Sequence, residues 1–199
     1  MIDVRRAPVH AVVDKAATAL RAGDVVALPT ETVYGLAALP SIPGATRRLF
    51  ELKGRGPEVP VAVLCADAGQ ALALAESPTK RVVAVAERCW PGPLTLVLRR
   101  RAGLGYELGE PATTIGLRCP DHALVQAVAA EVGPIATTSA NRHGEPTPVD
   151  ATGVAAVFDD GVALVLDGGR CTGAPSTVID ATGVPWKILR QGALPVDLG

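Results

Sequence analysis

Apolar residues recur at helical spacing near the start of the chain and then gather into short runs. Between His10 and Arg21 they fall every three or four positions, which predicts an amphipathic helix, and Gly23 follows where a left-handed residue often ends a helix. The apolar run from Val25 to Leu28 is ended by Pro29, which is typical of a buried strand. This strand is expected to deliver its carboxyl end to a polar segment.

The alternation of helical and strand patterns continues along the whole chain. Further helices are predicted at 44–52, 79–88, 121–131 and 150–158. Asp121 is the expected N-cap of the third of these. Further strands are predicted at 61–65, 94–98, 113–117, 134–138, 163–166, 177–179 and 187–189. Strands outnumber the helices that could serve as crossovers, so we expect an α/β fold with a mixed parallel and antiparallel sheet in a single domain over residues 1–199.

Composition supports a globular protein and narrows the class of partner. The chain has 199 residues, of which 48% are hydrophobic and 20% charged, and this excludes disordered, collagen-like and coiled-coil classes. Lysine and arginine number 19 against 20 acidic residues, giving a net charge of −1. A whole-protein attraction to nucleic acid or to anionic membranes is therefore not expected, although a local basic surface stays open.

Cysteine and histidine are spaced too widely to indicate a metal site. No C-x-x-C pair occurs among Cys65, Cys89, Cys119 and Cys171. Nor do the three histidines have the close spacing of helical metal ligands. With no clear signal peptide and no long apolar run, the sequence predicts a cytoplasmic protein with reduced thiols, no bound structural metal and no membrane contact.

Three polar segments follow short apolar runs: P-T-E-T-V-Y-G-L at 29–36, P-I-A-T-T-S-A-N at 134–141 and D-G-G-R-C-T-G-A-P-S-T at 167–177. Loops at strand ends are where α/β proteins bind ligands. Each segment alone fits an ordinary turn whose hydroxyl and amide side chains satisfy local backbone groups. Three of them in one domain favour a shared cleft.

Several cations also follow apolar runs. A charge there is expensive to bury unpaired, so Lys53, Arg55, Arg118 and Arg190 are expected either to face solvent or to meet an anion in a cleft. We expect Lys53 and Arg55 to be exposed loop cations. The basic run 99–101 favours a solvated turn, with an RNA contact as the minority interpretation. Because the chain has no phosphate-binding P-loop, scattered Arg, Lys, Ser and Thr side chains would hold any nucleotide.

Seven motifs in a fixed order resemble the threonylcarbamoyl-AMP synthase family, also called the YrdC domain family. They are P-T-E-T-V-Y-G-L, L-K-G-R with a later Pro, W-P-G-P-L-T-L, G-L-R-C-P-D-H, T-S-A-N, D-G-G with S-T-V-I-D, and I-L-R-Q-G, and they run from Pro29 to Gly192. The resemblance implies a YrdC-like single domain with a concave ligand cleft. It also implies an enzyme that condenses L-threonine, bicarbonate and ATP to threonylcarbamoyl-AMP and pyrophosphate, for a downstream tRNA threonylcarbamoyl transferase complex.

The same resemblance assigns roles to individual positions. It implies that L-threonine is bound by Thr32, Arg118, Thr137 and Ser176, with Arg118 taking the carboxylate in a fork. It implies that ATP is bound by Arg55, Thr114, Ser139, Asn141, Thr147 and Arg190. Lys53 and Arg55 are the implied catalytic residues beside the phosphates, and Mg²⁺ is expected to arrive with ATP. Tyr34 and Trp90 are expected to pack rather than to react.

The sequence departs from the family pattern after Arg55. Gly56 follows it directly, Pro57 is displaced by one position and Val59 stands where the family has a polar residue, which puts one ATP contact in doubt. The chain also ends soon after the last motif, as in the short single-domain form of the family.

Two other functions stay open on the sequence. One is an RNA-binding module without chemistry, and the other is a paralogue that forms a carbamoyl-adenylate for a different acceptor. A weak tRNA contact is compatible with the first function and with the family's enzyme. The sequence does not decide the oligomeric state, nor whether the chain is the housekeeping enzyme.

Overall fold

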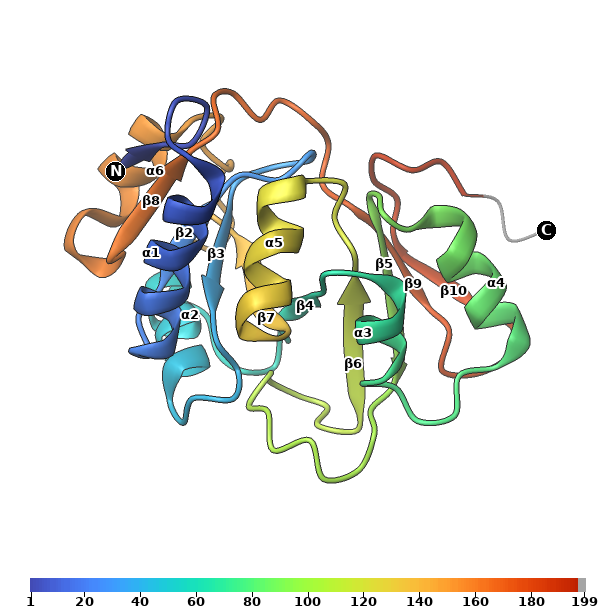
Figure 1. Ribbon diagram of the computed structural model, residues 1–199. Coiled ribbons are helices and arrows are strands. Elements are labelled where there is room, and N and C mark those ends of the chain that lie inside the picture. Colours follow the sequence, from blue (N-terminus) through green and yellow to red (C-terminus); the bar gives the residue numbers. More distant parts are fainter. Residues whose placement is uncertain (197–199) are drawn as a thin grey trace.

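Ten strands form one mixed sheet in the computed structural model, which describes residues 1–196 (Figure 1). In chain order the strands are β1 (Ile2–Asp3), β2 (Val26–Leu28), β3 (Gly35–Ala38), β4 (Ala62–Leu64), β5 (Leu94–Arg99), β6 (Thr114–Arg118), β7 (Ile135–Ser139), β8 (Leu164–Asp167), β9 (Thr177–Asp180) and β10 (Lys187–Arg190). Their order across the sheet is β1-β8-β2-β3-β7-β4-β6-β5-β9-β10.

The pairing of the strands confirms the predicted mixed sheet. Parallel pairs are β1 with β8, β8 with β2, β4 with β6 and β5 with β9. Antiparallel pairs are β2 with β3, β3 with β7, β7 with β4, β6 with β5 and β9 with β10. The last two strands are joined by a short connection and pair antiparallel, as expected for neighbours that no helix separates.

Six α-helices accompany the sheet: α1 (Val9–Arg21), α2 (Ala45–Lys53), α3 (Ala68–Leu72), α4 (Lys80–Cys89), α5 (Ala123–Val132) and α6 (Ala151–Phe158). Thr79 and Asp150 cap α4 and α6 by accepting backbone N–H bonds. The expected cap of α5 at Asp121 is wrong. That helix begins at Ala123, after His122, which makes no side-chain capping bond.

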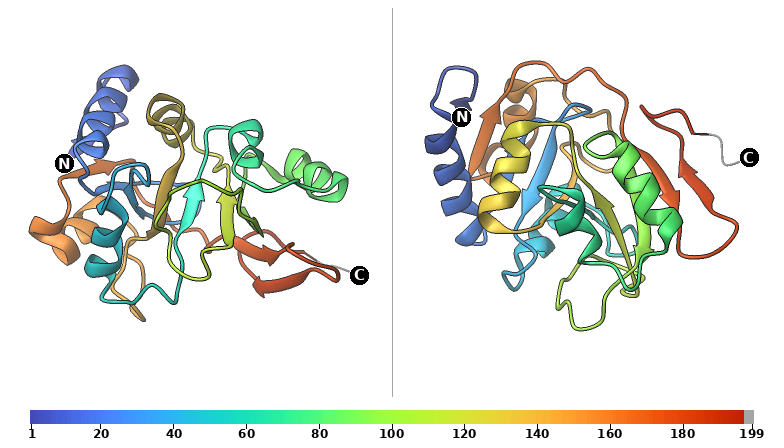
Figure 2. Two further views of the ribbon diagram at one scale, coloured as in Figure 1. Left: turned by 90° about the horizontal axis from the view of Figure 1, so that it is seen from below. Right: turned by 45° about the vertical axis from the view of Figure 1, so that its right-hand side comes forward.

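The helices cover the sheet unevenly. In the left view of Figure 2, α1, α5, α3 and α4 lie along one side, while α2 and α6 lie on the other side, where α2 contacts β3 and β7 and α6 contacts β8. Buried side chains of α1 and α5 form one apolar cluster with the sheet, and those of α2, α3, α4 and α6 contribute to a second. Between α2 and the β9–β10 hairpin, this face of the sheet borders a cleft.

Two strands and one α-helix were not predicted, and the most important is β3. We expected residues 29–36 to be a polar loop, but Gly35–Ala38 is a fully buried strand between β2 and β7. It contains no β-branched or aromatic residue, so its strand signal is weak, and burial between two neighbouring strands overrides local propensity. The other two elements, β1 and α3, contain only two and five residues.

Candidate functional site

A cleft of about 620 Å³ lies on the sheet face between the loop after α2 and the β9–β10 hairpin. Gly35 on β3 and Gly116 on β6 line it, and neither adds a side chain to the space. All of the predicted site residues except Lys53 line the same cleft: Thr32, Arg55, Thr114, Arg118, Thr137, Ser139, Asn141, Thr147, Ser176 and Arg190. The fold thus brings together residues that lie far apart in the sequence.

Arg118 is fixed at the carboxyl end of β6, where it is 7% exposed. Its Nε donates to the carbonyl of Gly92 at 3.2 Å, and its Nη2 donates to Thr32 Oγ1 at 3.0 Å. Nη2 also lies 2.7 Å from Glu31 Oε1, forming a buried ion pair. Within residues 1–196, Nη1 makes no hydrogen bond, so this nitrogen is the part of Arg118 that is left for an anion in the cleft.

A tight turn after β2 determines the direction of the Thr32 hydroxyl. Thr30 Oγ1 accepts the backbone N–H groups of Thr32 and Val33 at 3.2 Å, and its own proton goes to the Val33 carbonyl at 2.6 Å. The 2.8 Å contact between the two threonine hydroxyls therefore has Thr32 as its donor. Thr32 accepts from Arg118 and donates to Thr30, so it holds the guanidinium in place.

On the opposite wall, a chain of three side chains connects β5 to the β9–β10 hairpin. Arg190 donates from Nε to the Ser176 carbonyl at 2.9 Å and from Nη2 to Ser176 Oγ at 3.0 Å. Ser176 Oγ also lies 2.9 Å from Thr95 Oγ1. Ser176, which the resemblance assigns to L-threonine, is thus hydrogen-bonded to Arg190, which it assigns to ATP. Thr95 is buried and lines the cleft, but it was not predicted as a site residue, although it belongs to the motif W-P-G-P-L-T-L.

The side-chain amide of Asn141 holds the loop after β7, and both of its polar atoms make hydrogen bonds within the protein. Asn141 Oδ1 lies 2.7 Å from Lys53 Nζ, 2.6 Å from Ser139 Oγ and 3.2 Å from Thr147 Oγ1, and all three donate to it. Asn141 Nδ2 donates to the carbonyls of Arg142 at 2.8 Å and Glu145 at 2.6 Å. Because both amide atoms are used inside the protein, Asn141 shapes the cleft wall.

Lys53 is placed differently from the expectation of an exposed loop cation. It is the last residue of α2 and is 3% exposed, so that expectation is wrong. Its ammonium donates to the Ser139 carbonyl at 2.9 Å as well as to Asn141. Burial, with a smaller contribution from Arg55, lowers the pKa of Lys53 to about 8. Lys53 therefore supports the loop from behind the cleft wall.

Arg55 reaches the cleft from the loop after α2. Its guanidinium carbon lies 5.9 Å from the centre of the Phe50 ring, and its Nη2 is at 3.5 Å from the Pro60 carbonyl. Burial lowers the pKa of Arg55. Its Nε is buried and has no hydrogen-bond partner among residues 1–196. A cation with so few protein partners retains most of its donors for a ligand.

The segment that departs from the family pattern forms part of the cleft rim. Val59 lines the cleft, so an apolar side chain occupies this position. The segment is held from behind by Gly109, which has a φ of +95° and where an added Cβ would lie 2.6 Å from the Pro57 carbonyl oxygen. Only glycine tolerates both that backbone angle and that close approach. The effect of Val59 on ATP binding stays a prediction.

A family model named Sua5_yciO_yrdC and described as telomere recombination matches residues 18–192. The chain belongs to the Sua5/YciO/YrdC family. It is 39% identical over 184 residues to threonylcarbamoyl-AMP synthase of Pyrococcus abyssi, covering 92% of this chain and 54% of the relative. It is 37% identical to a putative threonylcarbamoyl-AMP synthase of Mycobacterium tuberculosis, and the match covers 90% of this chain and 83% of the relative. The chain thus spans about half the length of the first relative.

A solved member of the Sua5/YciO/YrdC family has the same fold. The crystal structure of Pyrococcus abyssi Sua5 complexed with L-threonine matches with a TM-score of 0.86 and 39% identity, over 92% of this chain and 54% of that one. The predicted family and the predicted α/β fold are therefore confirmed. The roles of single residues are not tested by these likenesses and stay predictions.

Two aromatic residues of the family motifs have the expected packing environment. Trp90 is buried and donates from Nε1 to the Leu94 carbonyl at 2.7 Å. Tyr34 is buried at the cleft wall, where its hydroxyl donates to the Gly169 carbonyl at 2.7 Å and accepts the Gly168 N–H at 3.1 Å. Burial raises the pKa of Tyr34 to about 12, so it stays neutral and ties the D-G-G loop to β3.

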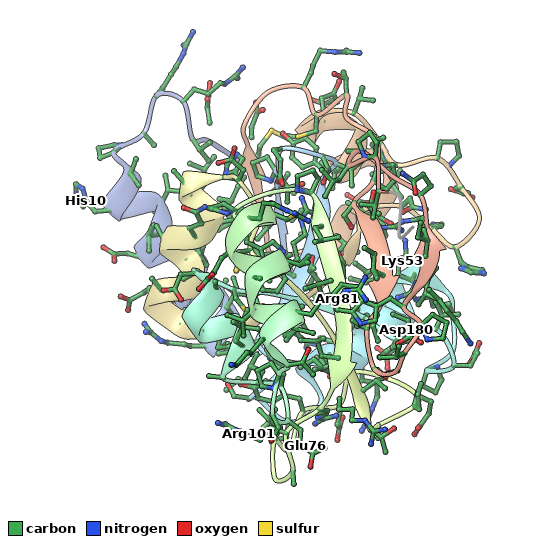
Figure 3. All side chains as sticks on the ribbon, turned by 90° about the vertical axis from the view of Figure 1, so that its right-hand side faces the viewer. His10, Lys53, Glu76, Arg81, Arg101 and Asp180 are labelled. Atoms are coloured by element: carbon green, nitrogen blue, oxygen red, sulfur yellow. The ribbon has the colours of Figure 1, made fainter. Side chains whose placement is uncertain are left out.

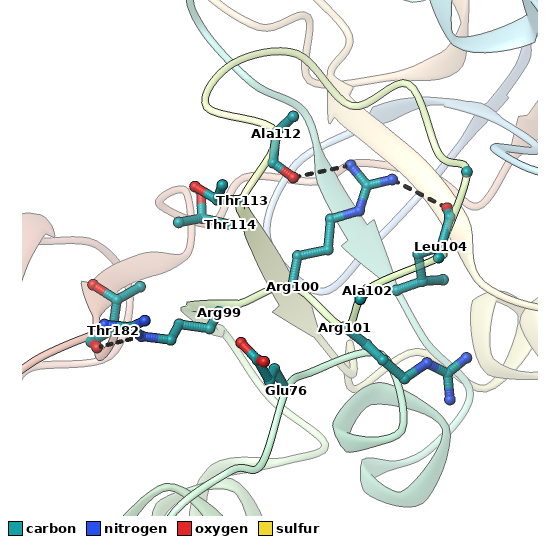
Figure 4. Close-up of a pocket in the computed structure, with 12 residues that line it drawn as sticks. Glu76, Arg99, Arg100, Arg101, Ala102, Leu104, Ala112, Thr113, Thr114 and Thr182 are labelled. Atoms are coloured by element: carbon teal, nitrogen blue, oxygen red, sulfur yellow. Dashed lines mark hydrogen bonds between the residues drawn. The ribbon is translucent and has the colours of Figure 1, made fainter.

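The basic run 99–101 lies at a second depression, of about 690 Å³, at the end of β5 (Figure 4). Its three guanidinium groups point in different directions. Arg99 donates to the Thr182 carbonyl at 3.4 Å, and Arg100 donates to the carbonyls of Leu104 and Tyr106 at 3.1 and 2.5 Å. Figure 3 shows Arg101 well apart from Lys53. The run therefore does not converge on one anion, and RNA binding there stays a prediction.

The structure offers no protein cage for a cation in the part of the chain that it describes. Across residues 1–196, no group of three or more His, Cys, Asp or Glu residues is arranged to hold a metal ion. Over the same range, no helix has the length and apolar character needed to cross a lipid bilayer.

Proposed function

We propose that this chain is a threonylcarbamoyl-AMP synthase, a nucleotidyltransferase that condenses L-threonine, bicarbonate and ATP into threonylcarbamoyl-AMP and pyrophosphate. Family membership and the names of the relatives support the activity. The observation that carries the proposal is the buried guanidinium of Arg118, whose Nη1 is left for a ligand in a cleft lined by hydroxyl groups and further cations. A 39% identical relative was solved in complex with L-threonine, which supports threonine as the substrate.

The threonine end of the cleft is built around Arg118. Its Nη1 receives the substrate carboxylate, while Thr32 holds the guanidinium from the other edge. We propose a contact through Nη1 in place of the fork that the family resemblance implies, because Nε and Nη2 already have protein partners. Ser176 and Thr137 complete the pocket. Thr137 Oγ1 donates to the Leu36 carbonyl at 3.0 Å, so its hydroxyl offers an acceptor to the substrate.

The ATP end lies between Arg55, Arg190 and the loop that Asn141 holds. Thr114, Ser139 and Thr147 line the same end and provide hydroxyl groups. Catalysis rests on positioning and on stabilisation of charge, since the carbamate oxygen attacks the α-phosphorus and no protein nucleophile is needed. Mg²⁺ enters on the phosphates, because the cleft residues offer no acidic cluster to hold it.

The adenylate is made for transfer by a separate tRNA threonylcarbamoyl transferase complex. With a net charge of −1, the chain has no general attraction to tRNA. Because the product is a small diffusible adenylate, we expect the synthase step to proceed without tRNA. The single domain over residues 1–199 and the cytoplasmic location are further parts of this proposal. The divergent arginines 99–101 do not favour a pure RNA-binding module.

Incubation with ATP, bicarbonate and L-threonine tests the proposal, with mass spectrometry of the products. We expect threonylcarbamoyl-adenylate in the complete mixture and its loss when threonine is left out. A carbamoyl-adenylate formed without threonine would instead favour the paralogue with another acceptor.

A further inference from the structure

Glu31 places a buried negative charge beside a cleft that must bind anions. Both of its carboxylate oxygens are covered by protein, and neither has a hydrogen bond of good geometry within residues 1–196. Oε1 nevertheless lies 2.7 Å from Arg118 Nη2, and the two side chains are 21% and 8% exposed. Burying such a pair costs desolvation energy that its attraction often fails to recover. The pair therefore calls for an explanation beyond stability.

Two groups beside Glu31, His122 and Cys171, add no positive charge to the pair. Burial lowers the pKa of His122, which leaves its imidazole neutral at pH 7, and the Glu31 carboxylate only partly opposes this shift. Burial raises the pKa of the Cys171 thiol, with a further contribution from Glu31. The Arg118–Glu31 pair thus carries no net charge of its own, and the further positive charge near Arg118 is that of Arg190, whose pKa is lowered by burial and by Arg118.

We infer that Glu31 is a selectivity residue, which makes this end of the cleft bind a zwitterionic α-amino acid in preference to a simple carboxylate anion. The inference rests on the proposed function, in which Arg118 receives the carboxylate of threonine. Glu31 acts through its field and through Arg118, because its own oxygens are covered.

The preference follows from the signs of the charges. A simple anion is attracted by Arg118 but repelled by Glu31, so the Glu31 charge reduces the gain that the anion receives from the arginine. An α-amino acid carries an ammonium group two bonds from its carboxyl carbon, and Glu31 attracts that group. Interactions between charges a few ångströms apart are strong where protein excludes water. Loss of the Glu31 charge leaves a net positive charge at this end of the cleft, which favours the anion and disfavours the zwitterion.

Calorimetric titration with L-threonine and with (R)-3-hydroxybutyrate, which is threonine without its amine, measures the preference. For the unaltered protein we expect the Kd of the hydroxybutyrate to exceed that of threonine by at least about tenfold. In Glu31→Gln, which keeps an acceptor for Arg118, we expect threonine to bind more weakly and the hydroxybutyrate more tightly. Each Kd is expected to change by about tenfold. Glu31→Asp, which keeps the charge, should preserve the ratio of the two values.

Glu131→Gln is the matched control. Glu131 Oε1 lies 2.7 Å from Arg21 Nη2, as in the buried pair, but these side chains are 46% and 53% exposed and lie outside the cleft lining. Titration of Glu131→Gln should give the same Kd values for threonine and the hydroxybutyrate as titration of the unaltered protein. Equal weakening of both ligands in Glu31→Gln, or no change in their ratio, would overturn the inference. So would tight hydroxybutyrate binding by the unaltered protein, a result that needs no variant to fold. Failure of the unaltered protein to bind threonine would instead contradict the proposed function.

Discussion

In the cleft and at the far end of β5, cationic side chains meet very different surroundings. Arg118, Arg190 and Lys53 are held by acceptors from several strands and loops that are distant in the sequence. Arg99 and Arg101 are exposed neighbours in the sequence, yet their side chains diverge. Topology, rather than sequence proximity, therefore brings cationic side chains together around one cleft. The contrast predicts large effects for changes in the cleft and small ones at the run.

Replacing Arg118 should have the largest effect. Arg118→Ala removes the proposed charged contact to the threonine carboxylate, worth about 1.5–3 kcal/mol, so the KM for threonine should rise by roughly 10- to 150-fold. The KM for ATP should change much less. The variant also leaves Glu31 buried without its partner, which costs about 3–5 kcal/mol of unfolding free energy. Steady-state pyrophosphate release and chemical denaturation measure the two effects.

The exposed partner of Glu131 provides the control. Arg21→Ala breaks an ion pair of equal length at the surface, where such pairs contribute about 0–1 kcal/mol. If Arg118→Ala weakens both substrates equally, the assignment of this end to threonine is wrong.

Replacement of Lys53 tests whether this buried cation supports the loop at the cleft wall through Ser139 and Asn141. In the folded protein its pKa is about 8, below the ordinary value of 10.5, so burial destabilises the charged form. The resulting cost, on the order of 3 kcal/mol, is fully present below pH 8 and disappears as the pH rises toward 10.5. Lys53→Met removes this dependence. It also removes a donor from Asn141, so the KM for ATP should rise more than that for threonine.

Denaturation of the unaltered protein and of Lys53→Met at pH 7 and pH 10 measures the difference. The unaltered protein should gain stability relative to the variant at the higher pH. Parallel pH dependence of the two proteins would show that Lys53 carries no such shift.

Thr95 offers a smaller test within the cleft. Thr95→Val keeps the shape but removes the hydroxyl next to Ser176, so one hydrogen bond of about 0.5–1.5 kcal/mol is lost. We expect a corresponding rise of roughly two- to tenfold in the KM for threonine. Thr95→Ser keeps the hydroxyl and should stay near the original value. Identical kinetics for the two variants would remove Thr95 from the site.

The arginine run should have the smallest effect on synthesis. The informative variant replaces Arg99 and Arg101 by Ser but retains Arg100, which holds the carbonyls of Leu104 and Tyr106. Pyrophosphate release should be unchanged. Any tRNA binding should be weak, and its salt dependence should become shallower by about 0.7–0.9 for each phosphate that the variant no longer neutralises. A large loss of synthesis would contradict the contrast between the two regions.

The sequence predicted the alternating elements and, through its motifs, most of the cleft lining. The prediction was wrong where the structure of a segment depends on contacts with segments that are distant in the sequence. The strand at Gly35–Ala38 exists because β2 and β7 flank it, and the burial of Lys53 depends on Ser139 at the end of β7, 86 residues further along the chain. Periodicity contains no information about such contacts.

Glu31 and Thr95 illustrate the same limit within the site. Both stand in motifs that resemble those of the family, but no pattern indicated that Glu31 would pair with Arg118 or that Thr95 would reach Ser176. Both contacts join segments from different strands, so they follow from the order of strands in the sheet.

Pyrophosphate release from ATP and bicarbonate, measured with and without L-threonine and in the absence of tRNA, tests the central claim most directly. The proposed synthase should release pyrophosphate only when threonine is present, because the threonine carbamate is the group that attacks ATP. The reaction should not respond to tRNA. Release that is independent of threonine, or that begins only when tRNA is added, would contradict the account.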